Sequence, residues 1–338
     1  MSKKSIGATL FNVSADMLNH SKFLMEVTLV PNLLILPSSA ISVILNILTV
    51  VIIIASKKLR TKCFALLAFN SAADCLVGVT YLARSSLRVH RHFAGTGEII
   101  DVWQCCQELA LLIFAQIWSL GMNIALVIER IIAIFCPIKY KAWSFCQLTL
   151  PSVLLSILFA LAQLAVHLND SWLGADVVLE TCGIEDTVSP KSLSVLTAIQ
   201  ITMSVAVISL HAILIYGVKK QKRKIRVVPS QTTAAVRRQM AKLDADMKFL
   251  KAISAIVITQ SCTLAAKFVI FLMDKFSGSI GRLLASRYGS QVVVLSCAVD
   301  FVSLAIMSSQ FRRATKKLIA LGKNTAPTKN VVLHIEMK

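Results

Sequence analysis

Seven long apolar stretches dominate this sequence and limit what it can fold into. Each could cross the roughly 30 Å hydrocarbon core of a bilayer as a helix that rises about 1.5 Å per residue. They occupy residues 31–55, 64–84, 108–134, 147–168, 193–217, 250–273 and 289–308. A lipid-exposed backbone must satisfy its own hydrogen bonds, and these stretches are continuously apolar rather than alternating, which favours helices over a membrane barrel. We therefore expect an all-α membrane protein, a bundle of seven transmembrane helices.

The composition agrees with this fold class. The chain is 56% hydrophobic with a mean hydropathy of +0.72, and only 16% of its residues are charged, which is too little polar surface for a soluble protein of this size. Residues 1–20 lack an apolar stretch, so the first helix is expected to serve as its own insertion signal. Pro31 and Pro37 are expected in the first turns of that helix, where proline is tolerated. Three parts follow: an extracellular segment 1–30, the bundle 31–310, and a cytoplasmic tail 311–338.

Basic residues predict how the bundle is oriented. They concentrate after the first stretch, after the fifth and after the seventh, and the positive-inside rule makes these segments cytoplasmic and the N-terminus extracellular. The main ones are Lys57, Lys58, Arg60, Lys62, Lys219, Lys220, Lys222, Arg223, Lys224, Arg226, Arg312, Arg313, Lys316 and Lys317. Three glycosylation sequons, at Asn12, Asn19 and Asn169, fall on the predicted outer side. The net charge of +19 thus sits beside the membrane, which argues for lipid or an acidic protein partner and against nucleic acid.

Glu129 and Arg130 stand at the predicted inner end of the third helix. One interpretation is an arginine that reaches the lipid headgroups. The other is a switch, in which a carboxylate holds the arginine in one state and releases it in another. Asp244 or Asp246, just before the sixth stretch, would then supply a second latch.

These residues carry a resemblance to a known family. Glu129-Arg130-Ile131, followed by Pro137-Ile138-Lys139-Tyr140, resembles the Asp/Glu-Arg-Tyr motif and second loop of rhodopsin-like G-protein-coupled receptors. Asn46 and Asp74 match the polar core residues of that family in type and spacing. Tyr216 matches its tyrosine near the inner end of helix 5. Phe311, with the basic residues after it, matches the start of its short amphipathic helix on the membrane.

The departures from the family pattern point to a divergent branch. Helix 7 reads Asp300-Phe301-Val302-Ser303-Leu304 where the family has Asn-Pro-x-x-Tyr, and helix 6 reads Cys262-Thr263-Leu264-Ala265 where Cys-Trp-x-Pro is usual. Such a chain is similar to the nematode serpentine chemoreceptors of the Srsx-like class.

The resemblance implies two internal features. Cys105 and Cys182 match the disulfide between helix 3 and the second outer loop, with Cys106 as a rival partner for Cys182. Asn46, Asp74 and Asp300 are expected to meet in the bundle interior, with Asn123 as a neighbour. Two carboxylates so close would share a proton or a cation, so either a sodium ion bound by Asp74 and Asp300 or a hydrogen-bonded structural cluster is expected.

The same resemblance limits the chemical class of the ligand. Leu112 stands where amine receptors carry aspartate, and Val294 where opsins carry the retinal lysine, so a biogenic amine and covalent retinal are disfavoured. Lys267 either snorkels or pairs with Glu108, or serves as a counter-ion for an acidic or carbonyl-bearing ligand. The expected lining residues in the outer half are Glu108, Leu109, Leu112, Ile113, Gln116, Gln200, Lys267, Phe268 and Gln291.

The sequence shows no phosphate loop, metal-ligand spacing or other catalytic constellation, so neither an enzyme nor a cofactor is expected. The resemblance implies a multi-pass receptor in the plasma membrane, such as that of a sensory cilium. It would couple an extracellular small-molecule or peptide ligand, a chemosensory cue of unknown identity, to a heterotrimeric G protein. The alternatives are a receptor-like protein that no longer signals and a small membrane transporter, although no internal repeat favours the latter.

Overall fold

The computed structural model describes residues 3–95, 100–174, 177–179, 182, 187–226, 259 and 279–324, and most of them are helical. Six helices contain a stretch that is long and apolar enough to cross a membrane: α1, α2, α3, α5, α6 and α8. The remaining expected stretch, 250–273, lies outside the described residues apart from Thr259. The elements are α1 (Lys3–Ala55), η1 (Lys57–Leu59), α2 (Lys62–Ala94), β1 (Ile100–Asp101), α3 (Val102–Phe135), α4 (Pro137–Ala142), α5 (Phe145–Leu173), β2 (Val178–Leu179), α6 (Pro190–Arg226), α8 (Ser279–Met307) and α9 (Ser309–Asn324).

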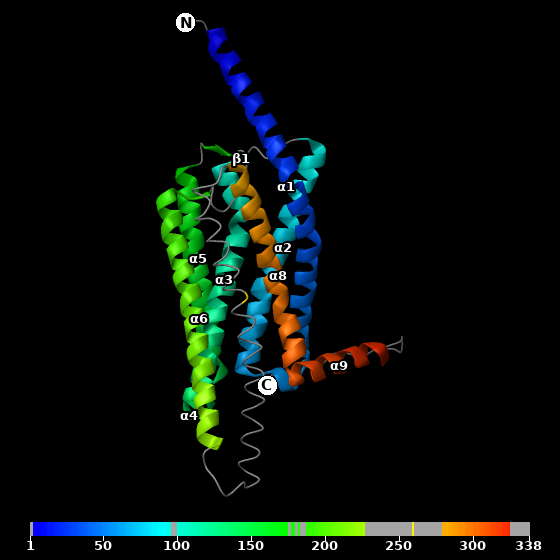
Figure 1. Ribbon diagram of the computed structural model, residues 1–338, viewed down its shortest axis with the longest axis vertical. Helices are drawn as coiled ribbons and strands as arrows, with labels where there is room; N and C mark the ends of the chain where they lie inside the picture. Colours follow the sequence, from blue (N-terminus) through cyan, green and yellow to red (C-terminus); the bar gives the residue numbers. More distant parts are fainter. Residues whose placement is uncertain are drawn as a thin grey trace.

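Helix α1 is much longer than its apolar part. It begins at Lys3, and its N-terminal portion projects beyond the other helices (Figure 1). Pro31 and Pro37 therefore lie inside the helix, and the expectation that they occupy its first turns is wrong. An apolar stretch marks where a helix crosses lipid, whereas the polar residues before it extend the same helix beyond that region.

Several helix ends follow from local sequence. The side chain of Asp101 caps α3 by accepting a hydrogen bond from the backbone N–H of Gln104 at 2.6 Å. Ser144 and Gln147 form a reciprocal capping box at the start of α5, in which each side chain accepts from the other residue's backbone N–H. Gly95 ends α2 in the left-handed conformation, with φ of 67°, that glycine adopts without steric cost.

Helix α3 lies at the centre of the bundle and packs against α2, α5 and α6, while α1 packs against α2 and α8 (Figure 1). Gly121 lets α3 approach α5 closely, since a Cβ atom there would lie 2.9 Å from Cβ of Ser156. At the far end of α8 the chain turns sharply into α9. This is the short helix expected after the seventh stretch, although it begins at Ser309 rather than at 311.

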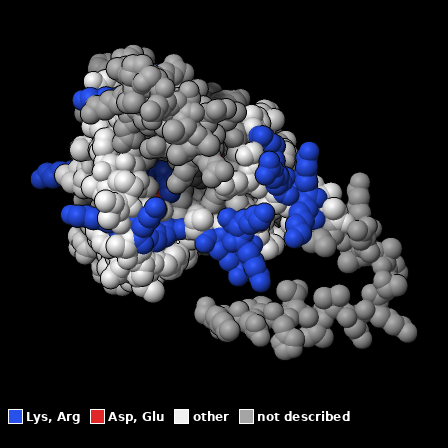
Figure 2. Space-filling model, turned by 90° about the horizontal axis from the view of Figure 1, so that it is seen from below, with Lys and Arg blue, Asp and Glu red and all other residues white. Residues whose placement is uncertain are grey.

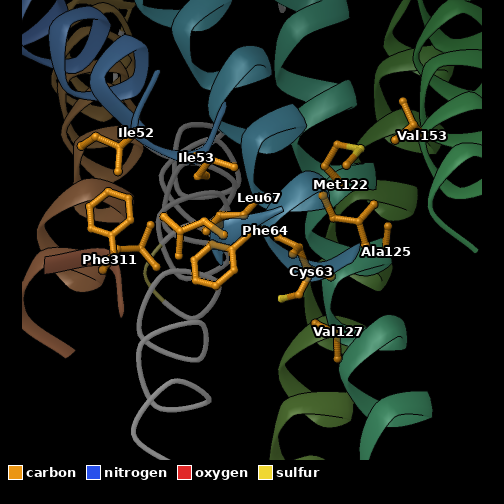
Figure 3. Packing of buried hydrophobic residues seen from close by; sticks show 14 of the residues in the cluster. Ile52, Ile53, Cys63, Phe64, Leu67, Met122, Ala125, Val127, Val153 and Phe311 are labelled. Atoms are coloured by element: carbon orange, nitrogen blue, oxygen red, sulfur yellow. The ribbon is translucent and has the colours of Figure 1, made fainter. Parts of the chain in front are cut away.

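The buried interior has three layers along the helices. We call the end of the bundle that carries Cys105 the outer end and the end that carries Arg130 the inner end. An inner apolar cluster contains Phe64, Leu67, Met122 and Phe311 (Figure 3). An outer apolar cluster contains Tyr81, Leu109, Leu112 and Val294. Between the two clusters lies a layer of buried polar side chains that includes Asp74 and Asp300.

Candidate functional site

A buried carboxylate organises the inner end of α3. Glu129 is only 1% exposed, and its oxygens accept hydrogen bonds from Nε and Nη2 of Arg130 at 2.5 and 2.6 Å. The hydroxyl of Tyr140 donates to the same carboxylate at 2.5 Å. Bonds to an ionised acceptor are about twice as strong as neutral ones, so this contact holds the guanidinium in place. We call Glu129, Arg130 and Tyr140 the inner lock.

Tyr140 reaches the lock from α4, which opens on Pro137 after α3 ends. Lys62 at the start of α2 donates to the carbonyl oxygen of Tyr140 at 2.7 Å and to that of Trp143, and its Nζ lies 4.6 Å from the centre of the Tyr140 ring. Burial, and then the bond to Glu129, raise the pKa of the Tyr140 phenol, so it remains a protonated donor at neutral pH. The lock thus ties α2, α3 and α4 together.

Of the other predicted switch residues, Tyr216 alone lies in the part of the chain that the structure describes. Tyr216 on α6 is 66% exposed, so its ring points out of the bundle rather than into it. Asp244 and Asp246 lie outside the described residues. From the sequence, Lys62 counted only among the basic residues that orient the bundle, and the Tyr140 hydroxyl had no role. The available signal was Pro137, which starts a helical turn that carries Tyr140 back toward Glu129.

The polar layer links two of its predicted members, Asp74 and Asp300, through the side chain of Asn70. Nδ2 of Asn70 donates to Asp300 at 2.9 Å and to Asp74 at 3.3 Å, so it bridges the two carboxylates. Ser119 donates to Asp74 at 2.6 Å. Nδ2 of Asn46 donates to the carbonyl oxygen of Cys297, in the helix that carries Asp300, at 3.0 Å. Asn123, the fourth predicted member, is buried on α3.

The chemistry of this layer fits a monovalent cation. Among the described residues, Oδ1 of Asn46 and Oδ1 of Asn70 are buried acceptors that receive no hydrogen bond, and the amide of Asn70 contacts both carboxylates. Hard cations take such oxygen ligands. In the part of the chain that the structure describes, no cluster of three or more His, Cys, Asp or Glu residues suits a more highly charged metal.

The segment after α5 is fastened to the outer end of α3 by two kinds of contact. A disulfide joins Cys105 to Cys182, and Cys106 keeps a free thiol. Strands β1 and β2 pair Ile100 with Leu179 and Asp101 with Val178 in antiparallel register. The segment after α5 is thereby held over the start of α3.

Three arginines of α2 complete this end. Nη2 of Arg84 and Nη2 of Arg88 both donate to the carbonyl oxygen of Cys182, and Arg91 forms an ion pair of 2.8 Å with Glu108 on α3. Arg88 is only 2% exposed. Sequence reasoning missed these roles, although arginines spaced four and three residues apart in the outer part of an apolar helix were a usable signal. Glu108 therefore pairs with Arg91, while Lys267, the partner considered from the sequence, lies outside the described residues.

The predicted lining residues have different surroundings. Leu109, Leu112 and Ile113 are packed into the outer apolar cluster. Nε2 of Gln116 donates to the Tyr81 hydroxyl, and Nε2 of Gln291 donates to the carbonyl oxygen of Pro31, each at 3.0 Å. Gln200 is half-buried on α6, and Phe268, like Lys267, lies outside the described residues.

Comparison with known proteins identifies the family. Residues 39–319 match the model of a family described as the serpentine type 7TM GPCR chemoreceptor Srsx. The chain belongs to the Srsx chemoreceptor family. This match confirms the expected resemblance and the seven-transmembrane fold class, and it covers all seven apolar stretches except the first residues of the first one. No curated protein matches the chain significantly.

The three sequons of this Srsx receptor all lie in helical segments. Asn12 and Asn19 belong to α1, and Asn169 is exposed in the last turns of α5. Ser171, the hydroxyl residue of the third sequon, is buried and donates to the carbonyl oxygens of His167 and Thr187. Its hydroxyl is therefore occupied once the helix has folded.

Proposed function

We propose that this Srsx receptor transmits the binding of an extracellular small-molecule or peptide ligand, a chemosensory cue, to a heterotrimeric G protein. The inner lock is the observation that carries this proposal. The buried carboxylate of Glu129 accepts hydrogen bonds from Arg130 and Tyr140 at the inner end of the central helix. Such a contact has two states, because breaking it frees the guanidinium of Arg130 at the surface where a cytoplasmic partner docks. A ligand acts by binding better to the released arrangement than to the closed one.

The inner surface supports a protein partner that is rich in acidic groups. Figure 2 shows Lys and Arg side chains spread across this face. The exposed ones are Lys57, Lys58, Arg60, Lys139, Lys141, Lys219, Lys220, Arg312, Arg313, Lys316 and Lys317. They belong to the same end of the bundle as the lock, so a partner that binds them is steered toward Arg130. Anionic lipid attracts the same residues, and both partners fit a receptor of the plasma membrane, including that of a sensory cilium.

The polar layer has a role in the same mechanism. We infer that Asp74 and Asp300 hold a sodium ion in the closed arrangement, assisted by the amide oxygens of Asn46 and Asn70. The ion offsets one of the two negative charges and so weakens the repulsion between carboxylates midway through the membrane, where an uncompensated charge costs about 2.5–3.5 kcal/mol on insertion scales. Loss of this ion would loosen the contact between α2 and α8.

Nucleotide exchange tests the proposal directly. Membranes containing the receptor would be assayed for GTPγS binding by a panel of G proteins, with volatile and water-soluble compounds added. The variant Arg130→Ala should abolish exchange at unchanged surface expression, whereas Lys191→Ala, which removes an exposed cation at the other end of the bundle, should leave it intact. Exchange that survives the loss of Arg130 would overturn the mechanism.

A receptor-like protein that does not signal is the second candidate. The observation that favours it is the stretch Asp300-Phe301-Val302-Ser303-Leu304, which forms uninterrupted helix in α8 where signalling relatives of the rhodopsin type carry proline and tyrosine. Folded receptor that binds a compound, but gives no exchange with any G protein of the panel, would support this alternative.

A further inference from the structure

Helix α4 is a short surface helix at the inner end of the bundle (Figure 1). None of the six described residues of Pro137–Ala142 is buried, and all but the half-buried Tyr140 are exposed. A helix this short is unstable by itself in water, and most helices in proteins are held in place by an apolar face that packs against the core. Since these residues bury no such face, polar contacts must hold α4 against the bundle.

Lys62, the first residue of α2, supplies polar contacts of this kind. Its Nζ donates to the carbonyl oxygen of Tyr140 at 2.7 Å and also to that of Trp143, the residue that follows α4. The last carbonyl groups of a helix have no partner within the helix, and the helix dipole favours a cation near them. Lys62 therefore satisfies two carbonyl groups at the end of α4 with one charged donor group.

The same ammonium group also contacts the side chain of Tyr140. Nζ of Lys62 lies 4.6 Å from the centre of the Tyr140 ring, which is within the range of a cation–π interaction. The hydroxyl of that ring donates to the buried carboxylate of Glu129. Lys62 thus contacts both the backbone and the ring of the residue whose hydroxyl belongs to the inner lock.

The chemistry of a lysine suits this position. Its ammonium is a compact charge with three donor hydrogens, which can serve two carbonyl oxygens while the charge faces the ring. Trp143 is 38% exposed, so water can solvate the end of α4 once the helix moves. Loss of the ammonium is therefore expected to free α4 while the buried apolar clusters stay intact.

We propose that Lys62 is a positioning residue of the inner lock: it holds α4 on the bundle and thereby keeps the Tyr140 hydroxyl on Glu129. Lys62 acts on Arg130 through Tyr140 and Glu129, so α2 contributes to the closed arrangement of the lock. When the contacts of Lys62 break, α4 leaves the bundle and takes Tyr140 with it. The inference rests on the proposed receptor function and names a residue that regulates the same lock.

Hydrogen–deuterium exchange of the full receptor tests this role. The backbone N–H groups of Tyr140 and Trp143 donate to the carbonyl oxygens of Cys136 and Lys139 at 2.9 and 3.0 Å, so their exchange reports whether α4 is formed. In Lys62→Met, which keeps an unbranched side chain but removes the charge, peptides covering residues 137–143 should exchange roughly tenfold faster than in the parent receptor, as expected for the loss of a charged hydrogen bond. Lys62→Arg restores the cation and should restore slow exchange.

Lys58→Met is the matched control, because Lys58 is an exposed cation of η1 at the same end of the bundle. It removes the same charge and should leave the exchange of residues 137–143 unchanged. Peptides from the centre of α3 should exchange at the parental rate in every variant, which shows that the bundle has folded. Parental exchange of residues 137–143 in Lys62→Met would overturn the proposal, and so would equally fast exchange in Lys62→Arg or Lys58→Met.

Nucleotide exchange tests whether Lys62 acts through Tyr140. Lys62→Met should raise basal GTPγS exchange at matched surface expression, and it should add little in the Tyr140→Phe background, because residues that act through one contact do not add. An equal rise in both backgrounds would overturn the proposal, since Lys62 would then act without Tyr140. Hydrogen exchange needs no G protein, so faster hydrogen exchange in Lys62→Met without any nucleotide exchange would count against the signalling function alone.

Discussion

Replacing Tyr140 by phenylalanine should activate the receptor without ligand. The variant removes the 2.5 Å hydrogen bond from the phenol to Glu129 and keeps the ring that packs against Lys62. A hydrogen bond to a charged acceptor contributes about 1.5–3 kcal/mol, and this one belongs to a carboxylate that is almost wholly buried. If the bond exists only in the closed arrangement, its loss shifts the equilibrium toward release by roughly 10- to 100-fold.

Basal GTPγS exchange at matched surface expression measures this shift. The same substitution in the Arg130→Ala background is the control, because the lock then has no guanidinium left to release and the two changes should not add. Basal exchange in Tyr140→Phe equal to that of the parent receptor would refute the idea that the lock holds the receptor closed. An equal increase in both backgrounds would show that Tyr140 acts elsewhere.

Three further predictions concern stability. Cys182→Ser removes the disulfide between residues 77 positions apart and should lower the free energy of unfolding by on the order of 4 kcal/mol in the chain-entropy model. The loss should appear as a lower Tm and reduced surface expression. Cys136→Ser is the control, because it replaces an exposed free thiol and should change neither quantity. Sodium chloride should raise the Tm of the parent receptor relative to choline chloride, and Asp300→Asn should remove the difference; a sodium effect that persists in this variant would place the ion elsewhere. The raised pKa of Tyr140 keeps its phenol protonated in the folded receptor at pH values where the unfolded chain, with an ordinary pKa of about 10, has ionised. The stability from this group is therefore complete below pH 10 and declines as pH rises above it, so Tm should fall more steeply between pH 9 and 11 in the parent receptor than in Tyr140→Phe.

Local sequence predicted some contacts well and missed others for a physical reason. The apolar stretches and the Glu129-Arg130 pair could be found because each depends on residues near one another in the chain. The arginines of α2 could not be interpreted in the same way. Their partners, Glu108 and the carbonyl oxygen of Cys182, come from α3 and from a segment beyond α5, so their role depends on how helices pack.

The start of α1 and the exposure of Tyr216 illustrate the same limit. Hydropathy reports which residues cross lipid, but a helix ends where capping and hydrogen bonding end it, and α1 therefore continues through Pro31 and Pro37 toward Lys3. Tyr216 matches a family position in the sequence, yet the rotation of α6 turns its ring outward. Rotation about a helix axis is set by tertiary contacts such as that of Gly217 with Phe135.

The sequence by itself determined the membrane class, the helical bundle and the family, because the cost of exposing peptide groups to lipid leaves few alternatives to a helix for each long apolar stretch. It also indicated that Asp74 and Asp300 needed partners. Only the tertiary structure decided what those partners are: Asn70 bridges the two carboxylates and Ser119 donates to Asp74. It likewise decided that the hydroxyl of Tyr140 donates to Glu129. Hydrogen bonds act over about 3 Å, so they depend on the rotation and depth of each helix, which no single stretch of sequence specifies.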